Sequence, residues 1–183
     1  EFPGIEVILQ EDTTAHLLVQ TANCEIDVAI VSDPINDDRF EQRELFVEEL
    51  FLAVPANHRL ATKRTITVAD LEQEKFLMMK EGHCLGDQVL RFCDRLDFHP
   101  IVSCRSAQME TIQSLVRTGL GVALVPEILA RAALARGELI RALPGDFATG
   151  QAYTLIYPDR SADLPHFARF RDWLRAEIEG IWA

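Results

Sequence analysis

The 183-residue chain is long enough for one ordinary domain or two small lobes, and a core of that size needs no disulfide or metal to hold it together. Hydrophobic residues make up 48% and charged residues 26%, a balance typical of soluble globular proteins and not of disordered segments. The formal net charge of −11 produces a field that repels a phosphate backbone, so this chain alone is not expected to hold DNA.

No stretch approaches the roughly 20 apolar residues that span a bilayer, and the first residues lack the basic start and apolar core of a secretory signal. We therefore expect a cytoplasmic protein with no membrane partner. Four cysteines are too few for a disulfide-dense secreted scaffold. In a reducing compartment such thiols serve packing, redox or metal chemistry.

In the first part of the chain, an apolar run at residues 5–9 predicts a strand. Helical spacing of apolar residues begins after Thr13 and Thr14, either of which can cap a helix, and residues 26–31 predict a second strand. This order of strand, helix and strand is typical of a parallel α/β sheet.

After extended segments over residues 45–54, strands and helices alternate again. We expect a helical turn at 68–71, a strand at 76–79, a helix at 84–94, a strand at 101–104, a helix at 108–117 ended by Gly119, strands at 122–125 and 152–157, and a final helix at 167–178. The chain is thus predicted to form two α/β lobes: lobe I from residues 1–54 plus 156–183, and lobe II from residues 55–155.

The segment from Gly82 to Cys93 holds two cysteines in different settings. If the helix begins near Cys84, that thiol lies at the positive end of the helix dipole beside free backbone N–H groups, which favours the thiolate that attacks peroxide. Neighbouring His83 can add positive charge or a hydrogen bond. Nine residues of α-helix rise about 13 Å and turn about 900°, so Cys84 and Cys93 can form a disulfide only if the helix reorganises.

A simpler interpretation is that Cys93 is a buried packing thiol and Cys84 an ordinary loop thiol, and the spacing alone favours it. Cys24 and Cys104 are expected to be packing thiols. A zinc site drawn from Cys84, Cys93 and His99 lacks the paired spacing of structural zinc motifs. We therefore expect neither a metal nor a cofactor.

The run Gly-His-Cys-Leu-x-Asp-Gln at residues 82–88, followed by Cys93, matches the sensor motif of the OxyR-type peroxide sensors among the LysR-type transcription regulators. Further matches lie at residues 11–18, 26–30, 69–71 and 110–111, and at Gly119-x-Gly121 before residues 124–126. The sequence therefore resembles the regulatory domain of that family, and the resemblance reverses the preference for packing thiols. It implies two Rossmann-like lobes, as in type 2 periplasmic binding proteins, in a regulator and not an enzyme.

By this resemblance, Cys84 reacts with hydrogen peroxide and Cys93 resolves the sulfenic acid into a disulfide, which a cellular dithiol reduces. His83 and Asp87 match motif positions beside the sensor thiol. Thr14 matches a threonine that helps to bind peroxide, and an N-cap role for it stays open as well. The family also implies a homodimer or tetramer whose packing and DNA binding the disulfide switches.

The sequence departs from the family pattern in two places. The arginine that supports the sensor thiolate in the family falls at Gln151 here, and a neutral amide supplies no charge. Compared with the family, the chain also opens after the first strand and helix of lobe I. It opens after the winged helix-turn-helix as well, and we expect contact with DNA only through that domain.

Two other functions remain open from the sequence. One is a LysR-type effector-binding domain that recognises a small metabolite in the cleft between the lobes, with the cysteines incidental. The other is a thiol enzyme with Cys84 as nucleophile and His83 as base, for which no third orienting residue is identifiable.

Overall fold

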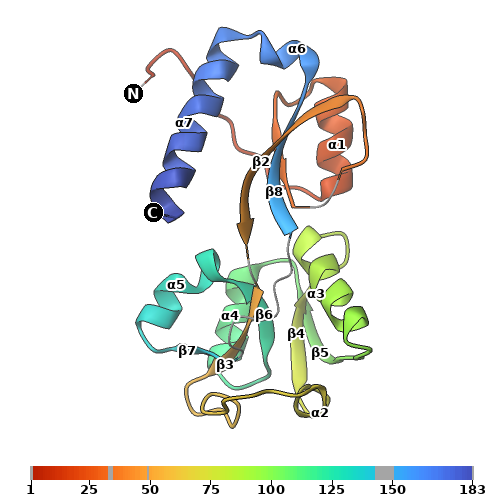
Figure 1. Ribbon diagram of the computed structural model, residues 1–183, viewed down its shortest axis with the longest axis vertical. Helices are drawn as coiled ribbons and strands as arrows, with labels where there is room; N and C mark the ends of the chain where they lie inside the picture. Colours follow the sequence, from red (N-terminus) through yellow and green to blue (C-terminus); the bar gives the residue numbers. More distant parts are fainter. Residues whose placement is uncertain (1, 33–34, 49, 143–150, 183) are drawn as a thin grey trace. The chain divides into compact units, whose positions relative to one another are not determined.

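The computed structural model describes residues 2–32, 35–48, 50–142 and 151–182, without the side chains of Gln151, Ile181 and Trp182. The chain divides into unit 1, which comprises Glu1–Val47 and Gln151–Ala183, and unit 2, which comprises Glu48–Gly150. Figure 1 labels most elements of the two units, which are described one at a time below.

Unit 1 contains a three-stranded sheet in the order β1–β8–β2, in which β1 runs antiparallel to β8. Its elements are α1 (Thr14–Asn23), β1 (Ala29–Val31), β2 (Phe40–Glu48), β8 (Gln151–Pro158), α6 (Asp159–Ala162) and α7 (Pro165–Trp182). Ile156 packs in one apolar cluster with Leu17 of α1, whereas Leu155 packs in another with Leu174 of α7. Because neighbouring strand residues point to opposite faces, α1 and α7 cover opposite faces of β8.

Unit 2 combines an antiparallel sheet in the order β6–β3–β7 with the parallel pair β4–β5. Its elements are β3 (Leu50–Pro55), α2 (Val68–Leu71), β4 (Lys75–Met79), α3 (Cys84–Arg95), β5 (Ile101–Ser106), α4 (Met109–Arg117), β6 (Ala123–Pro126), α5 (Glu127–Ala135) and β7 (Leu139–Arg141). A parallel bridge from Phe76 of β4 to Val122, just before β6, joins the two sheets. Helix α3 is the crossover between the parallel strands β4 and β5 (Figure 1).

The predicted fold class, two α/β lobes, is confirmed. The strand at 76–79, the cysteine-bearing helix at 84–94 and the helix at 108–117 appear within about two residues of their predicted ends as β4, α3 and α4. Gly119 ends α4 in a left-handed conformation with φ of 78°, as its position after the helix predicted.

The predicted strand at residues 5–9 is wrong, because this run forms no strand among the described residues. Its side chains Val7, Ile8 and Leu9 are 64%, 86% and 92% exposed. A strand is stabilised by hydrogen bonds to a neighbour, and an apolar run does not itself supply that neighbour. The predicted strand at 26–31 is likewise shorter, since only Ala29–Val31 pairs with β8.

The division between the units differs from the lobe boundaries proposed from the sequence. Strand β3 belongs to unit 2 because it pairs with β6 on one side and β7 on the other, although the sequence placed residues up to Val54 in lobe I. All of β8 belongs to unit 1, although the sequence assigned residues up to 155 to lobe II. The sequence also did not predict α5, β7 and α6.

The junction of the two sheets depends on Gly121, and we predict that Gly121→Ala lowers the free energy of unfolding by roughly 2 kcal/mol. An added Cβ would lie 2.3 Å from the carbonyl oxygen of Lys75, so the backbone of β4 or of the turn would have to move. Chemical denaturation measures the effect. Gly180→Ala is the control, because nothing lies within 4 Å of its added Cβ, and equal stability of the two variants would contradict the prediction.

Candidate functional site

The loop between β4 and α3 is fixed at the carboxyl end of the parallel strand pair. The N–H of Lys80 donates to the carbonyl oxygen of Ser106 at 3.0 Å, so the backbone ladder continues past the end of β4. The N–H of His83 donates to the carbonyl oxygen of Lys80 at 3.4 Å, and Gly82 takes the left-handed φ of 86° that this turn requires. The first residue of α3 is thereby placed at a strand end held by β5.

Cys84 is the first residue of α3 and is partly buried. His83 is the N-cap, with an extended backbone and no capping bond from its side chain, and its carbonyl oxygen accepts from Gly86 at 2.8 Å and Asp87 at 3.3 Å. The thiol thus lies in the first turn, where the partial positive charge of the helix favours an anion. Asp87 lies three residues after Cys84 on the same face of the helix, and its carboxylate disfavours a second negative charge in this first turn.

Gly86 lets α3 lie directly against the end of β4. A Cβ at this position would lie 2.9 Å from the carbonyl oxygen of Lys80 and 3.3 Å from that of Met79. Leu85, Val89 and other residues of the inward face are buried in the core of unit 2. The N-terminal half of α3 is therefore fixed by close backbone packing as well as by apolar contacts.

Cys93 lies in the core of unit 2, and its side chain is only 1% exposed. It shares its apolar cluster with Phe92 and Phe98. Burial, followed by the charge of neighbouring Asp94, raises the pKa of the Cys93 thiol from an ordinary 9.0 to about 11. This thiol is therefore protonated at neutral pH, and it is inaccessible to reagents while α3 is intact.

The two cysteines lie near opposite ends of one continuous helix, and both are free thiols. Nine residues of helix separate them by about 13 Å along the axis, beyond the Cα separation of about 7 Å that a disulfide tolerates. The predicted geometric conflict is therefore present in the structure: α3 must open before the two sulfurs can bond.

The remaining predicted site residues are placed as follows. His83 and Asp87 are brought together with Cys84 in the first turn of α3. Thr14 lies in the first turn of α1 in unit 1, where Thr13 and not Thr14 is the N-cap and accepts from the N–H of His16 at 3.4 Å. The predicted departure at Gln151 concerns a side chain that lies outside the described part of the chain.

The two other cysteines do not belong to α3. Cys24 follows α1 with φ of 64°, and Cys104 is a partly buried residue of β5. Over the described ranges no three His, Cys, Asp or Glu side chains are placed to hold a metal ion. Within those same ranges no helix has the length and apolar character needed to cross a bilayer.

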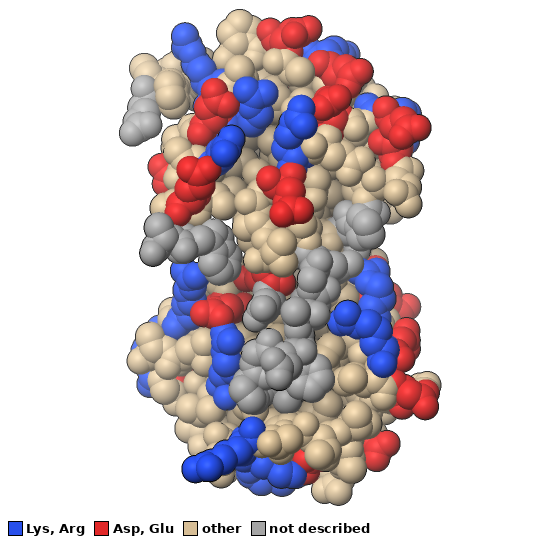
Figure 2. Space-filling view, in the orientation of Figure 1, with Lys and Arg blue, Asp and Glu red and all other residues tan. Residues whose placement is uncertain are grey.

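Acidic and basic side chains are interspersed over the face drawn in Figure 2. Among the described residues, charged side chains also pair locally: Arg117 and Arg136 both bind Glu138, at 2.8 and 2.7 Å, and Arg105 lies 3.8 Å from Glu81 in the loop before Cys84. That face therefore offers no continuous basic surface for a phosphate backbone.

Two residues that matter for this site were not predicted from the sequence. Gly86 was treated as a variable position of the motif, although a glycine inside a helical pattern signals close backbone approach. Asp97, which follows α3 with φ of 50°, gave no sequence signal. Its left-handed conformation depends on how the chain turns from α3 toward β5.

The fold defines a domain of two α/β lobes, and comparison with known proteins gives its family. Residues 1–179 match the family described as the LysR substrate binding domain, and the chain belongs to this family.

Two curated relatives match 69% of the chain. The DNA-binding transcriptional dual regulator OxyR of Escherichia coli is 33% identical over 127 residues, and the transcriptional dual regulator GltC of Bacillus subtilis is 32% identical over 128 residues. The aligned part is 42% of the former and 43% of the latter, so the chain spans less than half the length of these relatives. Both are named as transcription regulators, which confirms the prediction of a domain that is not an enzyme.

A solved structure, the peroxide-bound C206S mutant of Corynebacterium glutamicum OxyR, superimposes with a TM-score of 0.80 at 26% identity. The match covers all of this chain and 57% of that chain. The chain thus corresponds to the regulatory domain of such a protein.

The raised pKa of Cys93 predicts a loss of stability in alkali. The folded state holds this proton more tightly than the unfolded chain, so the stabilisation is complete below about pH 9 and disappears as the pH rises to about 11. The wild-type free energy of unfolding should fall over that interval by up to about 2 kcal/mol more than that of Cys93→Ala. Urea unfolding of both proteins with reductant present measures this difference, and parallel curves would contradict it.

Proposed function

We propose that this chain is the sensory domain of a LysR-type regulator that detects hydrogen peroxide by reversible formation of a Cys84–Cys93 disulfide. The observation that carries the proposal is the contrast between two thiols on one helix. Cys84 is partly exposed at the positive end of α3, whereas Cys93 is buried and protonated near the other end. Such a pair favours oxidation in two steps with a change of shape between them.

In the first step the Cys84 thiolate attacks one oxygen of hydrogen peroxide, the O–O bond breaks, and the departing hydroxide takes a proton to become water. Cys84 is then a sulfenic acid. In the second step the sulfur of Cys93 attacks the sulfur of Cys84, the S–O bond breaks, and the hydroxide combines with the proton of the Cys93 thiol. Peroxide is reduced to two waters in all, and a cellular dithiol returns both cysteines to thiols.

Three further residues belong to the proposed site. His83, the N-cap residue, and Asp87, in the first turn, flank the reacting sulfur and orient peroxide by hydrogen bonds. By the family resemblance, Thr14 of α1 in unit 1 is the third residue proposed to bind peroxide, through its hydroxyl. Opening of α3 alters the packing of two or more copies of the domain. The winged helix-turn-helix of the longer protein then binds DNA differently.

The names of the relatives support this function over metabolite binding. Several relatives at 30–33% identity are named as hydrogen peroxide-inducible genes activators, including those of Dickeya chrysanthemi and Haemophilus influenzae. GltC carries no such name, so membership of the family leaves a metabolite-binding domain as the second candidate.

A tryptic map tests the disulfide directly, because each cysteine falls in its own peptide. Cleavage after Lys80, Arg91 and Arg95 places Cys84 in residues 81–91 and Cys93 in residues 92–95. After one equivalent of peroxide, we expect these two peptides to be joined in the unreduced digest and separate after reduction. Mass spectrometry reads the link. Free thiols in both peptides would overturn the proposal.

Three variants separate the steps. Cys93→Ser should stop at a sulfenic acid that a dione reagent traps on residues 81–91, and Cys84→Ser should give no adduct. Cys104→Ser is the matched control and should retain the link. A peroxide response that survives in Cys84→Ser would favour metabolite binding, and continued peroxide turnover with excess reductant would favour a thiol enzyme.

A further inference from the structure

Among the described residues, four helices end in the same hydrogen-bonded turn, the Schellman motif, in which two backbone bonds close around a left-handed residue. In α3, the N–H of Phe98 donates to the carbonyl oxygen of Cys93 at 3.0 Å, and the N–H of Asp97 donates to that of Asp94 at 3.1 Å. The left-handed residues are Cys24 (φ 64°) after α1, Asp97 (φ 50°) after α3, Gly119 (φ 78°) after α4 and Gly137 (φ 69°) after α5.

Glycine takes this conformation without steric cost, whereas a residue with a Cβ does not. Two helices of unit 2, α4 and α5, use glycine there, but the helix with both sensor cysteines uses Asp97. Asp97 is exposed at this position. No hydrogen bond or ion pair of its side chain compensates within the described residues. The C-terminal turn of α3 is therefore weaker than the equivalent turns of α4 and α5.

Cys93 belongs to this weak turn. Its carbonyl oxygen accepts the closing bond from Phe98, and it also accepts from the N–H of Leu96 at 3.1 Å. The side chains of Cys93 and Phe98 are both 1% exposed and share one apolar cluster. Cys93 cannot leave the core while these bonds and contacts hold, so opening of the turn is a necessary step toward the disulfide.

The other end of α3 is held more firmly. A Cβ on Gly86 would lie 2.9 Å from the Lys80 carbonyl oxygen, so the first turns of α3 lie close against the end of β4. The N–H of Lys80 in turn donates to Ser106 of β5. Residues from Leu90 onward could fold back toward Cys84 while the first turns stay helical, because four residues reach about 13 Å when extended. The helix therefore has a fixed end that carries the sensor thiol and a weak end that carries the resolving thiol.

We propose that Asp97 is a positioning residue that sets the rate at which Cys93 is released to the Cys84 sulfenic acid, by keeping the C-terminal turn of α3 easy to open. This inference rests on the proposed two-step oxidation. In this inference, the stability of the C-terminal turn of α3 controls the rate of the second step but not the rate of the reaction with peroxide.

The main test is Asp97→Gly, which removes the steric cost and so folds at least as well as the wild type. We expect disulfide formation from the sulfenic acid to slow by roughly threefold to tenfold. The rate of sulfenic acid formation should not change. Rapid quenching with a dione reagent and an alkylating reagent measures both rates. In the reduced protein, the amide hydrogens of residues 97 and 98 should exchange more slowly with solvent.

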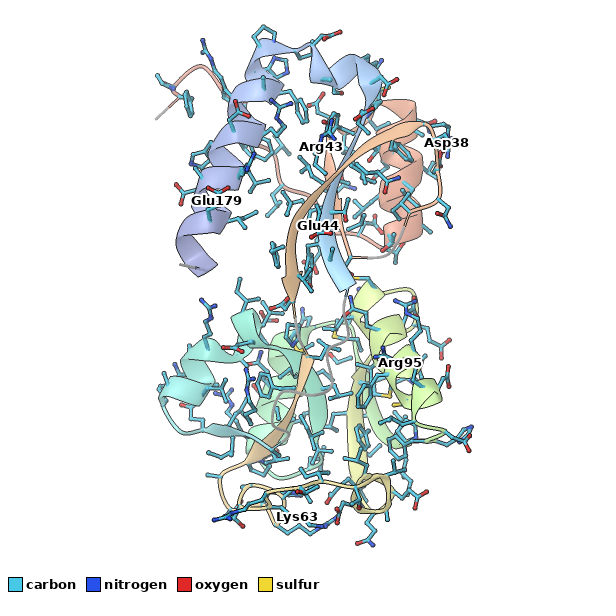
Figure 3. All side chains as sticks on the ribbon, viewed as in Figure 1. Asp38, Arg43, Glu44, Lys63, Arg95 and Glu179 are labelled. Carbon is cyan, nitrogen blue, oxygen red and sulfur yellow. The ribbon has the colours of Figure 1, made fainter. Side chains whose placement is uncertain are left out.

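Two matched variants complete the test. One shows whether backbone strain or charge at residue 97 sets the rate of the second step, and the other should change that rate in the opposite direction. Asp97→Ala removes the carboxylate but keeps the Cβ, so its disulfide should form no more slowly than that of the wild type. Arg95, labelled in Figure 3, lies in the helical last turn of the same helix, so Arg95→Gly should weaken that turn and speed the second step. A slow Asp97→Ala would assign the effect to charge and overturn the proposal.

The possible failures can be told apart. If the wild type forms the link between residues 81–91 and 92–95 but Asp97→Gly forms it equally fast, the role of Asp97 is overturned and the peroxide switch stands. If the wild type forms no link, both ideas fail. A change in the rate of sulfenic acid formation alone would also overturn the proposal, because Asp97 would then act on the reaction of Cys84 and not on the release of Cys93.

Discussion

A single continuous α-helix holds the two cysteines apart, and this separation is the constraint on which the proposed function depends. Helix α3 persists because its inward face is buried and its N-terminal backbone lies directly against β4. Each large apolar side chain on that face contributes about 1.5 to 3 kcal/mol when buried. Opening even the last turn thus costs several kcal/mol. A disulfide that forms in spite of this cost must carry the domain into a different conformation.

In the proposed function, the surroundings of the two thiols give them different tasks in an ordered sequence. Cys84 is partly exposed where the helix dipole favours an anion, so it can meet a small oxidant without any movement of the chain. Cys93 is shielded and its pKa is raised to about 11, so it does not react first. Burial thus shields Cys93 from direct oxidation, and its proposed participation in a disulfide is conditional on opening of the helix.

The sequence predicted those parts of the fold that depend on local pattern. Periodicity located β4, α3 and α4, and the spacing of Cys84 and Cys93 on a helix was sufficient to predict their separation. Prediction from the sequence failed where contacts with neighbouring elements determine the structure. Residues 5–9 have the composition of a strand but no described partner, and α5 (Glu127–Ala135) is rich in alanine, which obscures an apolar stripe. The roles of Gly86 and Asp97 arise from contacts between elements, which a local pattern does not contain.

The end of α3 illustrates how a locally unfavourable residue is compatible with a stable domain. Asp97 makes one helix end weaker than the equivalent ends after α4 and α5, yet the buried faces of Phe92 and Phe98 keep the turn closed in the reduced protein. A glycine at this position would stabilise the fold, but it would also raise the barrier to releasing Cys93. Departures from local preference are expected where function needs a marginal element. In this domain the departure falls four residues after Cys93, the thiol that must move if the proposed disulfide forms.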